Sequence, residues 1–246
     1  MSNSDQRDPY ILRLGGMRLF LRYMLLCLTA LLFLLPLYWL VSSSLKPEYQ
    51  IFAQPPVWWP VPPVWKNYID ALTELPFGLY TLNTLIIAVG AVIGHVLSCA
   101  LVAYAFARLR APGKDVLFVV LLATLMLPYP VVMIPQYIIF SEIGWVNSFK
   151  PLIVPTFLGN AFFIFLLRQF FLQIPIDLED AARIDGANLL QILWYVIFPI
   201  SRPAIATVAI FTFQFAWNDF LAPLIYLQDQ SKYTLMLGLS FFRSSF

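Results

Sequence analysis

The sequence is poor in the residues that metal sites and nucleophilic catalysis require. Its 246 residues include one histidine and two cysteines, Cys27 and Cys99. A metal site needs several such ligands, and a catalytic nucleophile needs a base beside it. Each cysteine lies inside an apolar run, where a thiol packs as a small apolar group, so we expect no disulfide. No phosphate-binding glycine loop is present either. The sequence therefore predicts no metal site and no catalysis by this chain.

Charged residues are also scarce. They make up 11% of the chain, against about 25% in soluble domains. The net charge is +2 and the basic residues are dispersed, which argues against nucleic-acid binding. Hydrophobic residues reach 61% and the mean hydropathy is +0.79. They are grouped into runs of roughly 20, the length of a helix that crosses a bilayer. These features predict an all-α membrane protein embedded in a lipid bilayer.

The apolar runs predict a polytopic helical bundle with five transmembrane helices. The expected spans are residues 19–41, 80–106, 116–140, 152–167 and 203–226. We expect a bend at Pro36 in the first span, and a bend caused by Pro128, Pro130 and Pro135 in the third. Arg168 is expected to end the fourth span by reaching the headgroups. The loop over residues 42–79, rich in proline and tryptophan, is predicted to be extracytoplasmic.

Lysine and arginine are unevenly divided between the two sides of these spans. Ten fall on the side of the amino terminus: Arg7, Arg13, Arg18, Arg22, Arg108, Arg110, Lys114, Arg168, Arg183 and Arg202. Five fall on the other side: Lys46, Lys66, Lys150, Lys232 and Arg243. Because cytoplasmic loops carry the excess of positive charge, the amino terminus is predicted to be cytoplasmic. The first run lacks a cleavage site, so we expect a retained span and not a signal peptide.

The loop between the fourth and fifth spans holds the one dense cluster of charged residues. Asp177 is expected to cap a short helix, with Asp180 as its capping-box partner. Gly186 is suited to the left-handed conformation that ends a helix. Ala181 and Ala182 leave the middle of this helix nearly bare, so the surface of another protein could approach it. We expect four charged side chains to make contacts around that face: Glu179, Asp180, Arg183 and Asp185.

A second short helix is predicted directly after this one. Asn188 is expected to cap it, with Gln191 at the capping-box position. This helix should run on to Pro199. The loop is therefore predicted to form a helix, a glycine turn and a second helix.

The spacing of these residues resembles the cytoplasmic EAA loop of ABC importer permeases. Asp180-Ala181-Ala182 is followed after three residues by Gly186 and, after nine more, by Val196, Phe198 and Pro199. The usual Glu, Ile and Leu are here Asp180, Val196 and Phe198, and adjacent Glu179 preserves the acidity. Further matches to maltose-type carbohydrate permeases extend from the first span to the chain end, in Leu35–Tyr38, Tyr104–Arg108, Ala182–Ala187 and Trp217–Phe220.

The resemblance implies a single transmembrane domain over residues 1–246 in the bacterial plasma (inner) membrane, with an ATPase-coupling loop at residues 174–199. It implies a second permease subunit, two nucleotide-binding ATPase subunits and an extracytoplasmic solute-binding protein. ATP and Mg²⁺ would bind the ATPases, and this chain would need no cofactor. Family members carry a sixth span beyond this region, so we expect that span to be absent here. The coupling residues implied are Asp177, Glu179, Asp180, Ala181, Ala182, Arg183, Asp185, Gly186 and Pro199.

Polar residues within the spans are candidates for the solute pathway. Asn218 and Asp219, beside Trp217, could contact solute, or could serve local packing next to Pro223. His95, midway along the second span, favours a neutral imidazole bonded to a neighbouring helix over a pathway role. The polar residues Asn83 and Asn160 are expected to cap helices or to bond to loops.

The sequence thus predicts the pore-forming subunit of an ATP-driven importer for a sugar or a related polyol. An alternative is the same machinery serving a peptide, an amino acid or an ion. A less favoured alternative is an ion-coupled secondary transporter or channel, in which we would expect buried charges and paired broken helices. A membrane-embedded enzyme would need a cluster of polar catalytic groups, and the sequence offers none.

Overall fold

The computed structural model describes residues 9–244, with the side chains of residues 16–241. Arg7 lies outside the described residues, as do the side chains of Arg13 and Arg243. Within the described part of the chain every regular element is helical, which confirms the all-α prediction. The elements are α1 (Pro9–Ser44), α2 (Glu48–Ile51), α3 (Lys66–Glu74), α4 (Phe77–Arg108), α5 (Lys114–Ala123), η1 (Thr124–Met126), α6 (Tyr129–Glu142), α7 (Lys150–Ile153), η2 (Val154–Leu158), α8 (Ala161–Gln173), α9 (Asp177–Ile184), α10 (Leu189–Ile192), η3 (Leu193–Ile197), α11 (Phe198–Ile200), α12 (Arg202–Asn218), α13 (Leu221–Tyr226), η4 (Gln230–Lys232) and α14 (Leu235–Ser244).

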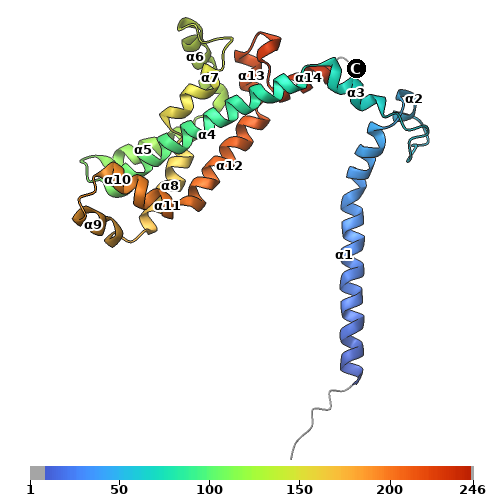
Figure 1. The fold of residues 1–246 in the computed structure, drawn as a ribbon, viewed down its shortest axis with the longest axis horizontal. Coiled ribbons are helices and arrows are strands. Elements are labelled where there is room, and N and C mark those ends of the chain that lie inside the picture. The colour runs from blue at the N-terminus through green and yellow to red at the C-terminus, as the bar shows by residue number, and fades with distance from the viewer. Residues whose placement is uncertain (1–8, 245–246) are drawn as a thin grey trace, which may run out of the picture. The chain divides into compact units, whose positions relative to one another are not determined.

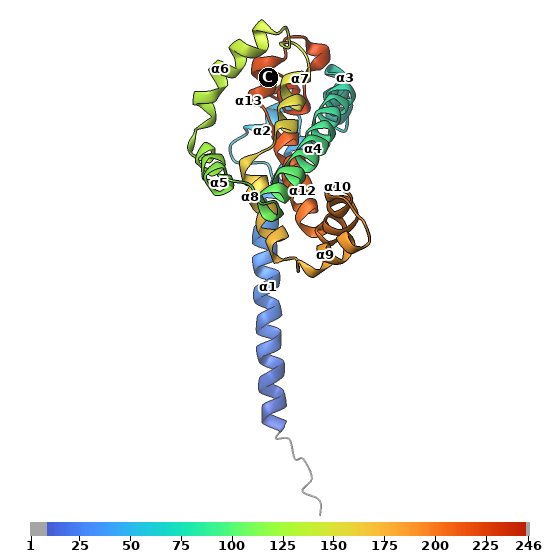
Figure 2. The ribbon, with the colours of Figure 1, turned by 90° about the vertical axis from the view of Figure 1, so that its left-hand side faces the viewer.

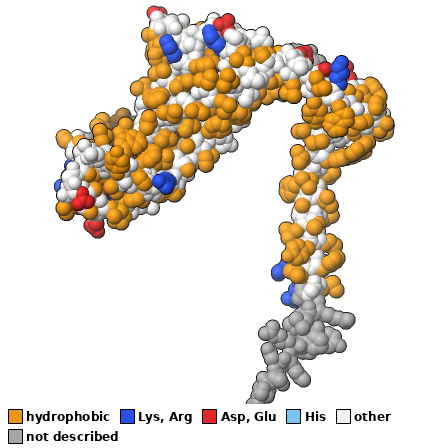
Figure 3. All heavy atoms as spheres, viewed as in Figure 1, with side chains coloured by type: hydrophobic (Ala, Val, Ile, Leu, Met, Phe, Trp, Pro, Cys, Tyr) orange, Lys and Arg blue, Asp and Glu red, His pale blue; other side chains and the backbone are white. Residues whose placement is uncertain are grey.

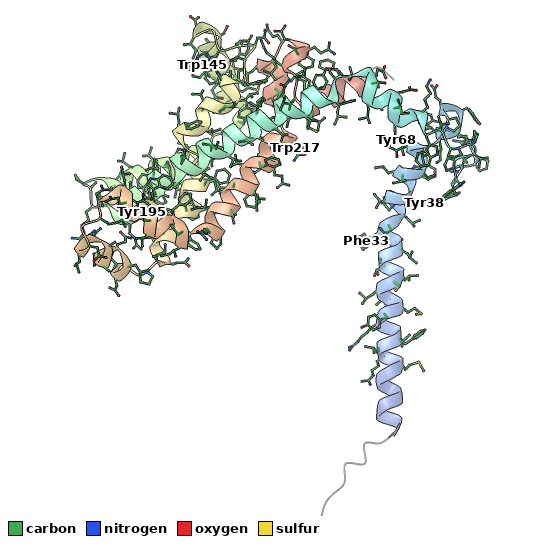
Figure 4. The ribbon with its side chains drawn as sticks, viewed as in Figure 1. Phe33, Tyr38, Tyr68, Trp145, Tyr195 and Trp217 are labelled. Atoms are coloured by element: carbon green, nitrogen blue, oxygen red, sulfur yellow. The ribbon has the colours of Figure 1, made fainter. Side chains whose placement is uncertain are left out.

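The chain forms two compact units, Met1–Glu74 and Leu75–Phe246, and the first is dominated by α1 (Figure 1). Its Gly16–Ser44 stretch is long and apolar enough to cross a membrane, and none of its most apolar window is buried within the protein. Phe33, labelled in Figure 4, is 81% exposed. A helix that is apolar on all sides suits lipid, so the first predicted span is confirmed. Pro36 lies inside α1 and does not end it.

The segment after α1 is more ordered than the sequence suggested. It contains the short helices α2 and α3. Lys46 is 1% exposed, and its ammonium lies 3.7 Å from the centroid of the Trp39 ring. Asn67 Nδ2 donates to the carbonyls of Ser44 and Lys46, at 3.0 Å each. Side-chain hydrogen bonds to backbone carbonyls thus hold this proline-rich stretch where regular secondary structure cannot.

The second unit is built around α4, against which α8 and α12 pack (Figures 1 and 2). Small residues of α4 let another segment come close. A Cβ added to Gly94 would lie 2.0 Å from Thr156 Oγ1, and Ser98 Oγ donates to the Thr156 carbonyl at 2.9 Å. A Cβ added to Gly90, one turn earlier, would lie 2.9 Å from Ile153 Cγ2. This spacing of small residues four apart is typical of closely packed membrane helices.

Three stretches are long and apolar enough to be candidate membrane spans: Gly16–Ser44, Phe77–Arg108 and Lys150–Gln173, the last made of α7, η2 and α8. The helix in the last stretch continues past Arg168 to Gln173, while the position of Arg168 at the headgroups stays a prediction. Its guanidinium lies 4.2 Å from the centroid of the Phe118 ring, and its Nε donates to the Phe106 carbonyl at 3.3 Å. Neighbouring elements thus supply the Arg168 side chain with a cation–π contact and a hydrogen-bond acceptor.

The third expected span is sharply bent, and a sharp bend at Ser201 comes directly before the fifth. Lys114–Met126 and Tyr129–Glu142 meet at 98°, and Leu189–Ile200 meets Arg202–Asn218 at 83°. The count reaches five only if each bent pair is one span. The first break falls at Pro128, as predicted, although the angle is larger than a kink. The predicted end of the fifth span at Tyr226 was wrong, because α12 ends at Asn218 and a separate helix, α13, follows.

The segment between α13 and α14 is attached to the start of α4 and to the loop before α7. Asn83 Nδ2 donates to the carbonyls of Ser231 and Tyr233, at 2.9 and 3.0 Å. Asn147 has a positive φ of 58°, and its Oδ1 accepts from the Asp229 amide at 3.0 Å. The prediction that Asn83 bonds to an adjacent loop is confirmed. Asn160 caps α8 by accepting from the amides of Phe162 and Phe163, also as expected.

Candidate functional site

The α9 helix covers the first half of the predicted coupling loop. The predicted cap was wrong: the N-cap position is Ile176, without a side-chain cap bond, and Asp177 is the first helical residue. Asp177 therefore lies in the first turn, where a carboxylate interacts favourably with the helix dipole. The predicted end is confirmed, because Gly186 has φ +84°. The Gly186 amide donates to the Arg183 carbonyl at 3.0 Å, and the Ala187 amide donates to the Ala182 carbonyl at 2.9 Å. These two bonds form a Schellman motif.

The second helix of the loop begins as predicted and ends within one residue of its predicted end at Pro199. Asn188 and Gln191 form a reciprocal capping box, with N···O distances of 2.8 and 2.9 Å. The chain then passes through a π-helical turn, Leu193–Ile197, and α11 includes Pro199 and ends at Ile200. The side chains of Ile192, Leu193 and Ile197 are 0% exposed and belong to the core of the second unit. This half of the loop is therefore packed into the bundle.

Glu179 is the most deeply placed charge of α9, with 0% exposure. It forms an ion pair with Arg108 and accepts a hydrogen bond from the Tyr104 hydroxyl at 3.1 Å, both from the last turns of α4. Arg183 Nη2, one turn later in α9, lies 3.7 Å from Glu179 Oε2, the oxygen that accepts from Tyr104. A buried carboxylate persists only when paired and hydrogen-bonded. The expectation that Glu179 makes contacts on the outward face of α9 was therefore wrong, because these partners draw it into the bundle.

Tyr104 and Arg108 were not predicted as functional residues, although both stand in a matched motif. The available signal was their spacing of four residues, which places both on one face of α4. Arg108 also donates to the Ile174 carbonyl, directly after α8. One guanidinium thus connects the end of α4 both to the exit of α8 and to α9.

The opposite face of α9 is exposed. Asp180 and Arg183 form an ion pair at 2.9 Å with side chains 53% and 44% exposed, and Ile184 is 87% exposed. Beside this face lies a hollow of about 330 Å³ lined by Ala182, Asp185, Gly186, Ala187, Gln191, Tyr195 and Val196. Figure 4 shows Tyr195 at this end of the bundle. The structure thus gathers Ala182, Asp185 and Gly186 at one hollow, whereas Pro199 lies outside it.

His95 contributes to a different cavity. Its Nδ1 lies 3.2 Å from Thr212 Oγ1 of α12, and its ring lies 5.3 Å from the Phe163 ring. The predicted bond to a neighbouring helix is confirmed. The cavity has a volume of about 610 Å³ and is lined by Ala91, His95, Tyr129, Leu152, Thr156, Asn160, Phe162, Phe163, Thr212, Phe215, Ala216 and Asp219. We call it the His95 cavity.

Trp217 and Asn218 lie on another side of α12 from the His95 cavity. They line a separate hollow of about 580 Å³ with Val89, Val92, Ile93, Ala209, Ile210, Phe213 and Gln214. Figure 4 shows Trp217 near the end of α12 that is remote from α9. Asn218 Nδ2 donates to the Gln214 carbonyl at 2.8 Å, and Asp219 Oδ1 accepts from the Ala222 amide at 3.3 Å. The four candidate pathway residues are therefore divided between two cavities.

Charge on the second unit lies mainly at its ends. On the face drawn in Figure 3, hydrophobic side chains cover the body formed by α4 and α12, and most charged side chains gather beyond it. No group of three or more His, Cys, Asp or Glu side chains that could hold a metal occurs among the described residues.

Residues 96–246 match the family described as binding-protein-dependent transport system inner membrane component. The chain is 35% identical to the diacetylchitobiose uptake system permease protein of Streptomyces coelicolor, over 90% of this chain and 73% of that protein. It is 31% identical to the sn-glycerol-3-phosphate transport system permease protein of Yersinia pestis, over 91% of this chain and 81% of that protein.

Among solved structures, the chain is similar to a bacterial ABC transporter involved in the import of the acidic polysaccharide alginate. The TM-score is 0.78 at 28% identity, over 98% of this chain and 82% of that one. These similarities, the helical fold and the α9–α10 loop all indicate the same family. The chain belongs to the inner membrane components of binding-protein-dependent transport systems, a family of multi-pass permease subunits of the bacterial plasma membrane that work with an ATPase and a solute-binding protein and are not themselves enzymes.

Proposed function

We propose that this chain lines the translocation pathway of an importer for a sugar or a related polyol. The relatives named above carry a disaccharide, a polyol phosphate or a polysaccharide by their descriptions, which supports a carbohydrate-type solute here. A second permease subunit would complete the pathway, and two ATPases would bind ATP and Mg²⁺. This chain would contribute no cofactor.

The observation that carries the proposal is the two-sided character of α9. One side is fixed to the end of α4 by the buried Glu179–Arg108 pair and the Tyr104 hydroxyl. The other side exposes Ala181, the Asp180–Arg183 pair and the Ile184 side chain. A helix built in this way can receive a partner on its outer face and pass the displacement directly to a membrane-spanning helix. We therefore assign the outer face to ATPase docking.

The α9 side of the bundle would be cytoplasmic, together with the amino terminus. The support is the positive-inside rule, since ten of the fifteen Lys and Arg residues fall on this side by our sequence assignment. When the ATPases close on ATP, α9 would move with them as a rigid body. Its fixed contact with Arg108 would then tilt α4 and the helices packed on it. His95, Trp217, Asn218 and Asp219 would face solute at different stages of that movement.

Docking can be tested at a residue whose loss leaves the fold intact. Ile184 is 87% exposed, so Ile184→Asp should preserve membrane insertion and thermal stability. It should abolish co-purification of the ATPase and ATP-dependent solute uptake by the assembled transporter. Gly186→Val should also abolish ATPase co-purification and uptake. It would disturb the left-handed turn, because a β-branched residue at φ +84° is strained.

The matched control for these variants is Ala111→Asp. Ala111 is exposed in the turn between α4 and α5, so this change adds the same charge on the same predicted side of the membrane. It should leave ATPase co-purification unchanged. Full uptake and normal ATPase recovery with Ile184→Asp would contradict the docking assignment.

A further inference from the structure

The His95 cavity has the size and the lining of a small-molecule site. Its volume of about 610 Å³ falls within the range of about 300–1,000 Å³ that is usual for such sites. Aromatic rings form much of its wall, from Phe162, Phe163, Phe215 and Tyr129. Rings of this kind pack against the C–H faces of sugar rings without requiring charge.

Polar groups in the same wall have hydrogen-bonding capacity to spare. His95 uses Nδ1 for Thr212, and Asn160 uses Oδ1 to cap α8. The remaining atoms, His95 Nε2, Asn160 Nδ2 and the Tyr129 hydroxyl, make no hydrogen bond within residues 16–241. These three atoms offer both donors and acceptors, as the hydroxyl groups of a polyol do.

The charge of the lining is one-sided. Asp219 is its one acidic residue, and neither lysine nor arginine is among the lining side chains. An anionic solute would lose water on entry and find no cation to replace it, which is unfavourable in a site of low dielectric constant. A hydroxylated, uncharged solute meets no such obstacle.

We propose that the His95 cavity is a binding subsite for an uncharged saccharide or polyol, and that it disfavours phosphorylated and uronic-acid solutes. The proposal rests on the proposed function and narrows its solute class. Of the solutes in the relatives' descriptions, diacetylchitobiose is uncharged, whereas glycerol phosphate and alginate are anionic. We therefore expect the solute of this chain to be uncharged, as diacetylchitobiose is.

The charge preference can be read with thiol reagents on the assembled transporter in nanodiscs. The background is Cys27→Ser, since Cys27 is exposed and Cys99 is buried. Phe215→Cys places a thiol in the His95 cavity, and Ile210→Cys places one in the hollow of Trp217 and Asn218; the native side chains are 67% and 65% exposed. Each thiol is treated with cationic, neutral and anionic methanethiosulfonates of similar size.

We expect the cationic reagent to modify Phe215→Cys at least about tenfold faster than the anionic one, after correction for their intrinsic rates. Asp219→Asn should narrow this ratio at position 215 and leave the ratio at position 210 unchanged. An anionic reagent that reacts at least as fast at position 215 would overturn the proposal.

The solute class is tested in the same preparation by protection of Phe215→Cys from the neutral reagent. The panel contains diacetylchitobiose, maltose and glycerol on one side, and sn-glycerol 3-phosphate and alginate oligosaccharides on the other. Slower modification with an uncharged member supports the proposal. Protection by anionic members alone, or by none of the panel, overturns it. Because ATPase recovery is measured on the same sample, loss of the ATPase would instead count against the proposed function.

Discussion

The two ends of α4 are attached to the rest of the second unit by different chemistry. At the Arg108 end, a buried ion pair and a phenolic hydrogen bond hold Glu179 of α9. At the Asn83 end, uncharged hydrogen bonds hold the segment before α14: Asn83 donates to two carbonyls, and the Leu235 amide donates to Thr84 Oγ1 at 2.8 Å. The charged attachment occurs where the proposed docking helix meets the bundle.

The two attachments depend to different degrees on having both of their partners. Removing one member of a buried ion pair leaves a charge without compensation and costs about 3–5 kcal/mol. Losing a neutral hydrogen bond costs roughly 1 kcal/mol. The α9 attachment is therefore expected to be the stiffer of the two and the more sensitive to single substitutions, as a connection that transmits movement requires.

The largest effect is expected from Glu179→Ala, which leaves the buried Arg108 guanidinium unpaired. The free energy of unfolding should fall by about 3–5 kcal/mol, and ATP-dependent uptake should be lost. The double variant Glu179→Met with Arg108→Met should recover much of the stability but not the uptake, since it restores packing without the ion pair. Chemical unfolding of the native protein, Glu179→Met, Arg108→Met and the double variant measures the coupling. Additive losses would show that the two side chains act independently.

The middle of α4 offers a test that involves neither end. Gly94→Ala should destabilise by about 1–3 kcal/mol, because the new Cβ would lie 2.0 Å from Thr156 Oγ1. The matched control is Gly78→Ala in the same helix, where nothing lies within 4 Å of the added Cβ. The midpoint of thermal unfolding should therefore be lower for Gly94→Ala than for Gly78→Ala. Equal midpoints would mean that the close approach of α4 and η2 is not tight in solution.

Asn83→Ala tests the uncharged attachment at the other end of α4. It removes the hydrogen bonds to the carbonyls of Ser231 and Tyr233 and should lower the free energy of unfolding by roughly 1 kcal/mol. Amide hydrogen exchange should rise in residues 229–235 and stay unchanged in α9. ATPase co-purification should be unaffected. An ATPase loss comparable to that of Glu179→Ala would remove the distinction between the ends.

The smallest effect is expected from pH at the Asn83 end. Hydrogen bonds from Asn147 and Lys232 lower the pKa of Asp229 below its ordinary value of 3.8. Because the folded pKa is the lower one, the stabilisation is complete above the ordinary pKa and is lost as the pH falls through the lowered value. Exchange in residues 226–233 should therefore increase in strong acid, and Asp229→Asn should remove that pH dependence. An unchanged profile in the variant would assign it to another group.

Local sequence determined the features that depend on neighbours a few residues apart. Apolar runs identified the candidate membrane spans, and the Asn188–Gln191 capping box and the Gly186 turn followed from their spacing. The same spacing, compared with the family pattern, identified the permease family and the loop. Each of these rests on backbone hydrogen bonds or on hydrophobic length within one segment.

The features that depend on distant partners follow from the tertiary structure and not from local sequence. Glu179 turns inward because Tyr104, 75 residues away, and Arg108 meet it there, and no local pattern fixes the direction of a charged side chain on a short helix. The angles of 98° and 83° within the bent pairs depend on how those helices pack, as does the division of Asp219 from Trp217 and Asn218 between two cavities. A sequence sets which groups can pair, but the pairing of buried charges is settled by which helices enclose them.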